Sequence, residues 1–177
     1  MSMFEWLAPA LLLLFAGPLH AAEGPGLGAP ANEADIAAWN IEIQPDGKGL
    51  PAGRGLAAEG EKIFAEKCQR CHGEKGGGKP NDQLVGGFGT LSAPEKPAVK
   101  TVGSFWPYAT TLFDYTRRAM PWDAPRSLSN PEVYALVAFL LRENGVIGAD
   151  DAMDADTLPR VVMPNRDGFI PFPRKPF

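Results

Sequence analysis

The sequence predicts a small, mostly α-helical domain with three main helices and a long irregular arm at each end. Three observations support this fold class. Apolar residues recur at helical spacing in three segments, residues 56–68, 105–120 and 129–145. The 20 glycines and 18 prolines indicate long irregular connections between and beyond these segments. A length of 177 residues suits one domain with extensions.

Residues 1–21 are predicted to be a signal peptide. Residues 7–17 form an apolar run that is too short to span a bilayer comfortably, and small residues follow at Ala21 and Ala22. We therefore expect export, cleavage near Ala21, and a location in a bacterial periplasm. The leader carries Glu5 but no Lys or Arg, so an uncleaved N-terminal anchor is the alternative. The formal net charge of -4 argues against a nucleic-acid partner.

Residues 22–54 lack a sustained period and contain repeated turn-forming pairs, so we expect an irregular N-terminal arm. The first helix follows at residues 56–68, and Gly60 and Phe64 share one of its faces. A glycine inside a helix costs about 1 kcal/mol relative to alanine. Gly60 therefore predicts that another backbone crosses this helix closely.

The second helix, residues 105–120, is expected to place Pro107 in its first turn. The third helix opens with a capping box, Ser129 followed three residues later by Glu132, and Gly145 supplies its stop. The five prolines of residues 148–177 forbid a helix there, so this segment is predicted to be an irregular C-terminal arm.

The motif CQRCH concentrates the chain's soft ligands in residues 68–72. A disulfide across two intervening residues gains little stability and leaves His72 unexplained. A thioredoxin-like pair needs βαβ surroundings, and a zinc site needs a fourth ligand. Covalent attachment of haem accounts for all three side chains, because Cys68 and Cys71 can each add to one vinyl group while His72 becomes the proximal iron ligand. We therefore predict one covalently bound haem c.

Apolar residues outside the motif are candidates for the lining of the haem pocket. They are Leu84, Val85, Phe88, Leu112, Phe113 and Leu136. Trp106 and Tyr108 are candidates for donating hydrogen bonds to a haem propionate, because buried Trp and Tyr need polar partners. Packing at the start of a helix is the alternative role for both.

A methionine thioether is the predicted sixth ligand of the iron. We favour Met120, since Pro121 and Pro125 stiffen the loop that presents it between two helices. Met153 lies in an acidic stretch and is expected to be exposed, whereas Met163 is the second candidate. An open or water-bound position is the remaining alternative. His/Met ligation fills both axial positions, which favours single-electron transfer over catalysis at the iron.

The order of these features resembles that of class I c-type cytochromes over residues 55–147. A helix with Gly60 is followed by CQRCH, then GKPND, an AMP loop and a last helix. The resemblance implies the fold of that class, with three helices around one haem. It also implies that the Pro80 carbonyl accepts the Nδ1–H of His72.

The same resemblance places two contacts between the first and last helices. It implies that Gly60 and Phe64 cross the last helix near Tyr134 and Phe139.

The flanking segments resemble the cytochrome subunits of bacterial molybdenum sulfite or sulfane dehydrogenases. The segments are WNIEIQPDGKGLP, KTVGSFWPYATTLFDYTRRAMPWDAP, SLSNPEVYALVAFLL and LPRVVMPNRDGFI. The resemblance implies a molybdenum enzyme as electron donor and another cytochrome or an oxidase as acceptor. Two alternatives are an electron acceptor for a quinoprotein alcohol dehydrogenase and a thiosulfate-oxidising haem enzyme. The latter would be expected to have an open iron or a Cys axial ligand.

Overall fold

The computed structural model describes residues 26–170 and divides the chain after Asn40 into two units. The first unit contains α2 (Glu33–Trp39). The Asn32 side chain accepts the Asp35 N–H at 3.0 Å, and Asp35 accepts the Asn32 N–H at 3.3 Å. The prediction that residues 22–54 are irregular was therefore wrong for the residues of α2. The predicted signal peptide and residues 171–177 lie outside the described residues.

The first predicted helix is confirmed as α3 (Ala57–Lys67), followed directly by the single turn of α4 (Gln69–His72). The Glu59 carboxylate accepts the Leu56 N–H at 2.8 Å and so begins α3. Gly60 is buried, and a Cβ atom there would overlap the carbonyl oxygen of Ala135. The close crossing predicted from Gly60 is thus present.

The segment that was predicted to form the second helix contains parts of two helices. Val102–Phe105 forms α5 and Ala109–Ala119 forms α6, with Trp106 and Tyr108 extended between them. The prediction of one helix from residue 105 was wrong, because a proline disfavours helical backbone in the residue before it and cannot donate to the preceding turn. Pro107 therefore separates the two helices.

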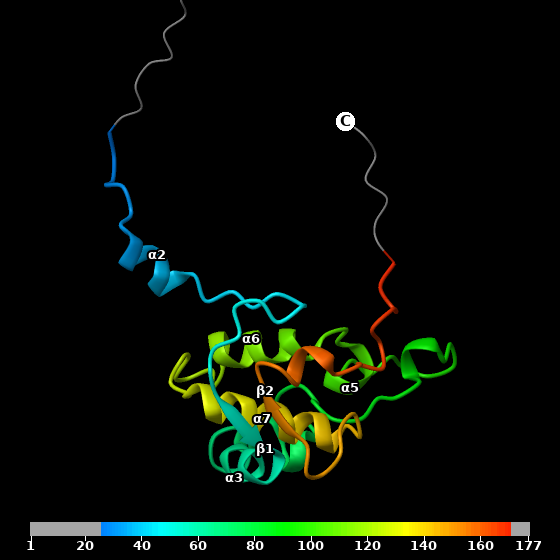
Figure 1. Cartoon of the computed structure of the whole chain (residues 1–177). Helices are drawn as coiled ribbons and strands as arrows, with labels where there is room; N and C mark the ends of the chain where they lie inside the picture. The colour runs from blue at the N-terminus through cyan, green and yellow to red at the C-terminus, as the bar shows by residue number, and fades with distance from the viewer. Residues whose placement is uncertain (1–25, 171–177) are drawn as a thin grey trace, which may run out of the picture. The chain divides into compact units, whose positions relative to one another are not determined.

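The third predicted helix is confirmed as α7 (Asn130–Glu143), which packs between α3 and α6 (Figure 1). The Ser129 N–H donates to the Glu132 carboxylate at 2.8 Å, and Gly145 adopts a positive φ of 64° after the helix. Phe139 meets Phe64 of α3 with 5.0 Å between ring centroids. The contacts expected near Phe139 are therefore observed.

The connections carry little regular structure. Short 3₁₀ turns form at Glu74–Gly76, Thr90–Ser92 and Leu158–Arg160. Strands β1 (Arg54–Leu56) and β2 (Ala152–Asp154) pair antiparallel, with Gly55 opposite Met153. Within residues 26–170, no helix is long and apolar enough to cross a bilayer.

The expectation that Met153 is exposed was wrong, because only 3% of it is accessible. Side chains alternate along a strand, so Met153 of β2 turns into the core while its neighbours Ala152 and Asp154 stay half-buried.

Candidate functional site

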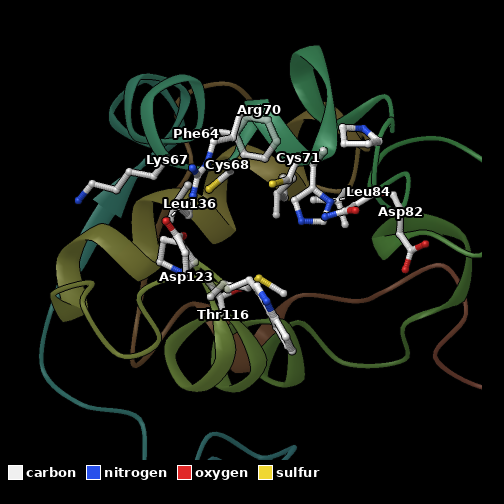
Figure 2. Close-up of a pocket in the computed structure, with 17 residues that line it drawn as sticks. Phe64, Lys67, Cys68, Arg70, Cys71, Asp82, Leu84, Thr116, Asp123 and Leu136 are labelled. Atoms are coloured by element: carbon white, nitrogen blue, oxygen red, sulfur yellow. Dashed lines mark hydrogen bonds and ion pairs between the residues drawn. The ribbon is translucent and has the colours of Figure 1, made fainter.

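A cavity of about 410 Å³ lies where α3, α4, α7, the last turn of α6 and the following loop meet. Its lining includes both cysteines, Cys68 and Cys71, together with His72 and Met120. Figure 2 shows Cys68 and Cys71 on one side of the cavity and Thr116 of α6 on the opposite side. The cavity therefore brings together both thiols, the imidazole and one thioether from segments about fifty residues apart in the sequence.

A second cavity of about 180 Å³ shares part of this lining. The residues common to both are His72, Asp82, Leu84, Thr116, Met120 and Leu140. His72 and Met120 therefore contribute to both spaces. The first cavity also exposes apolar side chains from α3 and α7, namely Phe64 and Leu136.

The expected apolar lining is observed only in part. Leu84 and Leu136 line the first cavity, and Leu112 lines the second. Val85 packs against the core instead, and Phe88 is 52% exposed.

Phe113 also lies away from both cavities. It is fully buried, and its ring centroid lies 4.4 Å from that of Tyr134. The sequence shows that Leu112 and Phe113 are both apolar, but the rotation of α6 decides that Leu112 lines a cavity and Phe113 packs in the core.

The cysteine motif folds as a continuation of α3. Cys68 ends α3, and its carbonyl accepts the N–H groups of Cys71 at 3.1 Å and His72 at 3.0 Å. This turn directs the motif at the cavity. Both thiols are free, and burial raises the pKa of Cys68 to about 11. Across residues 26–170, no group of three or more His, Cys, Asp and Glu side chains is arranged to hold a metal ion.

The His72 ring contacts the carbonyl oxygen of Asp82, with 2.9 Å from Nδ1 to that oxygen. The expectation that the Pro80 carbonyl would fill this place was wrong. The Asn81 N–H donates to the Cys71 carbonyl at 2.8 Å, which fixes the loop so that the next carbonyl along reaches the ring. A carbonyl only accepts, so the contact favours the tautomer with Nδ1–H and a free Nε2 lone pair. Pro80 itself lines the first cavity.

The three methionines of the described residues occupy different surroundings. Met120 directly follows α6, in extended backbone, and lines both cavities. Met153 and Met163 belong to the hydrophobic core, with 3% and 1% of their surfaces exposed, and line neither cavity. The preferred sixth-ligand candidate is therefore the methionine that shares a cavity with His72.

Trp106 and Tyr108, the two candidates for hydrogen bonds to a haem propionate, lie in different surroundings. Trp106 lines the second cavity and meets Tyr115 edge to face, with 5.8 Å between ring centroids. Tyr108 lines neither cavity, and its ring lies 4.2 Å from the Arg166 guanidinium carbon. A hydrogen bond from Trp106 or Tyr108 to a propionate stays a prediction.

Sequence reasoning missed several lining residues. Asp82 offers only a backbone carbonyl to His72, and any residue type could supply that atom. Arg70 and Asp123 line the first cavity and form an ion pair at 2.5 Å, although 53 residues separate them. Neither position carried a signal in the sequence, because charged residues at such spacing are common on surfaces.

The donor set fits a covalently held haem. Two thiols sit one turn apart, an imidazole next to them has its Nε2 free, and a thioether comes from a different segment of the lining. The apolar side chains Phe64, Leu84 and Leu136 suit a macrocycle. Cys68 and Cys71 would hold the ring, while His72 and Met120 would hold the iron.

Comparisons with known proteins show a family match and a structural match. Residues 55–140 match the family described as cytochrome c oxidase, cbb3-type, subunit III. The fold is similar to a chain in the crystal structure of the sulfane dehydrogenase SoxCD from Paracoccus pantotrophus, with a TM-score of 0.77 and 41% sequence identity. That similarity covers 84% of this chain and 72% of the other. No curated protein matched.

Proposed function

This chain belongs to the class I c-type cytochromes, and from that premise we propose that it is a periplasmic monohaem carrier that accepts electrons from a molybdenum-containing sulfite or sulfane dehydrogenase. The observation that carries the proposal is the shared cavity of His72 and Met120, beside the two cysteines. If both residues held the iron, no position would remain open for a substrate. The chain therefore transfers electrons and performs no bond-breaking chemistry.

Each residue of the site has a role that follows from its contacts. Cys68 and Cys71 would anchor the ring through thioether bonds, and His72 would bind the iron through Nε2. The Asp82 carbonyl, 2.9 Å from Nδ1, fixes the ring orientation and increases the basicity of the imidazole. Bound haem supplies an iron that cycles between the ferric and ferrous states. The Met120 thioether raises the potential at which that cycle occurs.

The proposed donor rests on similarity that extends beyond the haem-binding core. The structural match covers 84% of the chain, whereas the family match covers only residues 55–140. The flanking segments that resemble cytochrome subunits of molybdenum sulfite or sulfane dehydrogenases lie partly outside that core. We propose another cytochrome or an oxidase as acceptor. The signal-like residues 1–21 support a periplasmic location.

The donor is tested by following reduction of the purified, haem-loaded protein by absorbance. We expect reduction by sulfite or a sulfane substrate in the presence of a molybdenum sulfite or sulfane dehydrogenase, and no reduction when either component is omitted. Reduction by alcohol with a quinoprotein dehydrogenase, without reduction in the first assay, would instead assign the chain to a quinoprotein partner.

Carbon monoxide tests the alternative of a haem enzyme. A ferrous iron with both axial positions filled binds carbon monoxide slowly, because Met120 must first leave. Rapid binding to the reduced wild-type protein would contradict the carrier assignment and favour a haem enzyme with an open iron.

A further inference from the structure

An ion pair joins the two sides of the first cavity at the protein surface. Arg70 lies between the two cysteines on α4, and Asp123 lies three residues after Met120. The Arg70 guanidinium nitrogen is 2.5 Å from an Asp123 carboxylate oxygen, and both residues line the cavity (Figure 2). The pair thus connects the segment that would carry the ring to the loop that would supply the sixth ligand.

The backbone hydrogen bonds of residues 120–124 are local. The Met120 N–H donates to Thr116 of α6 at 3.1 Å, and the Ala124 N–H donates to Pro121 within the loop at 3.0 Å. Trp122, between them, is 81% exposed. These backbone hydrogen bonds hold the loop in shape but do not connect it to α4. The Asp123 carboxylate makes that connection through its ion pair with Arg70.

We propose that the Arg70–Asp123 pair is a tether that holds the Met120 loop closed, and that these two residues are positioning residues for the axial methionine. The side chains are 60% and 57% exposed, so solvent and salt screen the attraction. Such a pair contributes little to global folding. It acts on a local opening, in which few buried contacts are broken, and there a weak attraction changes the open population measurably.

Loop opening can be measured through ligand exchange at ferric iron. When the loop opens, the Met120 thioether leaves the iron and an imidazole from solution takes its place, with no electron transferred. At saturating imidazole, the observed rate reports the opening of the loop. The experiment needs the full haem-loaded chain and no partner enzyme, so it is independent of the proposed electron donor.

We expect D123N and R70Q each to raise this limiting rate by about two- to fivefold. The double variant should be no faster than either single variant, because both remove the same contact. Added salt should raise the wild-type rate toward that of D123N and leave D123N unchanged. D123E, which retains the charge, should remain close to wild type.

D114N is the matched control. Asp114 forms an exposed pair with Arg118 on α6 at 2.7 Å, and neither residue lines either cavity. D114N should leave the rate at the wild-type value.

A D123N rate equal to that of wild type, or a wild-type rate insensitive to salt, would overturn the tether while leaving the electron-carrier proposal intact. R70Q lies inside the attachment motif, so D123N and the salt series decide the result if R70Q fails to take up haem. A wild-type protein without the absorption band of methionine-ligated ferric haem would overturn the ligation by Met120 and the tether together.

Discussion

The two walls of the cavity are held in different ways. The histidine wall comprises α3, α4 and residues 73–86, and a buried helix crossing and a series of backbone hydrogen bonds fix it. The methionine wall comprises the last turn of α6 and residues 120–125. Residues 122–125 form an exposed loop with local backbone hydrogen bonds, and Asp123 pairs with Arg70 at the surface. His72, one proposed ligand, is therefore held by contacts to the core, whereas Met120, the other, lies beside a loop held mainly by local bonds.

Asn144 illustrates how strongly the histidine wall is supported. It is 3% exposed, accepts the Gly86 N–H at 3.0 Å, and donates to the carbonyls of Leu84 at 3.2 Å and Leu140 at 2.8 Å. These bonds attach the loop that carries Asp82 to the end of α7. The carbonyl that orients His72 is therefore indirectly anchored in the core.

The largest expected effect comes from substituting Met120, the proposed iron ligand on the methionine wall. Met120→Leu removes the sulfur lone pair but nearly conserves volume, so the fold should survive with a cost below about 1.5 kcal/mol from packing. We expect complete loss of the absorption band of methionine-ligated ferric haem and rapid carbon monoxide binding by the ferrous protein. Both are measured by optical spectroscopy.

Met163→Leu is the control for that substitution, because Met163 is buried in the core and lines neither cavity. Its spectrum should match that of wild type. If Met120→Leu kept the methionine band, or Met163→Leu lost it, the assignment of the axial ligand would be wrong.

Gly60→Ala is expected to disrupt the helix crossing that supports the histidine wall. Alanine normally stabilises a helix by about 1 kcal/mol relative to glycine, yet its Cβ would overlap the Ala135 carbonyl oxygen here. The α3 and α7 backbones would have to separate, so we expect a net loss of about 3 kcal/mol in the free energy of unfolding. Denaturant titration of the haem-loaded protein measures this loss.

Ala65→Ser adds one atom to an exposed position of the same helix and should cost less than about 0.5 kcal/mol. Equal midpoints for Gly60→Ala and Ala65→Ser would show that the crossing tolerates a side chain, contrary to the geometry.

Asn144→Ala tests the support behind His72. The substitution leaves the Gly86 N–H without its acceptor in a part-buried place, and we expect a loss of about 2 kcal/mol in unfolding free energy. Asn165→Ala serves as comparison, because that half-buried side chain makes one hydrogen bond, to the Phe105 carbonyl at 2.7 Å. A larger loss for Asn165→Ala would contradict the ranking of the two positions.

Local signals in the sequence predicted the main helices and the ligand candidates. CQRCH, Gly60 and the Ser129–Glu132 box each act through neighbours in the chain or through one steric requirement. The pairing of β1 with β2 was missed, because three-residue strands show no period and their contact joins distant segments. The burial of Met153 was missed for the same reason.

Positions that depend on loop geometry were also missed. The sequence could not decide between the Pro80 and Asp82 carbonyls, because every residue offers the same backbone atom. Backbone hydrogen bonds such as Asn81–Cys71 set the register of the loop, and the sequence does not show them. The break at Pro107 was misread as a first helical turn, since proline suits both a helix start and a helix interruption.

The smallest expected effect concerns the attachment of the histidine wall to α7. Lys67 of α3 and Glu132 of α7 form an ion pair at 2.8 Å, each about one-third exposed, and the Ser129 N–H and hydroxyl also donate to Glu132. The Lys67 hydrogen bond, followed by those from Ser129, lowers the pKa of Glu132 to about 2. The same pairing raises the pKa of Lys67, for which Glu132 is the main cause. The larger change at Glu132 reflects its additional donors.

The sign of the pH dependence follows from the depressed pKa of Glu132. The unfolded carboxyl, with a pKa near 4.5, binds a proton before the folded one does, so the stabilisation is complete above about pH 4.5 and is lost as pH falls toward 2. Because the pair is partly exposed, we expect it to contribute about 1 kcal/mol. Glu132→Gln should reduce the acid-dependent fall in unfolding free energy between these pH values, while Glu95→Gln, at an exposed loop position, should retain it. Parallel pH profiles for wild type and Glu132→Gln would mean that other carboxylates cause the acid loss, and that α3 and α7 stay together without this pair.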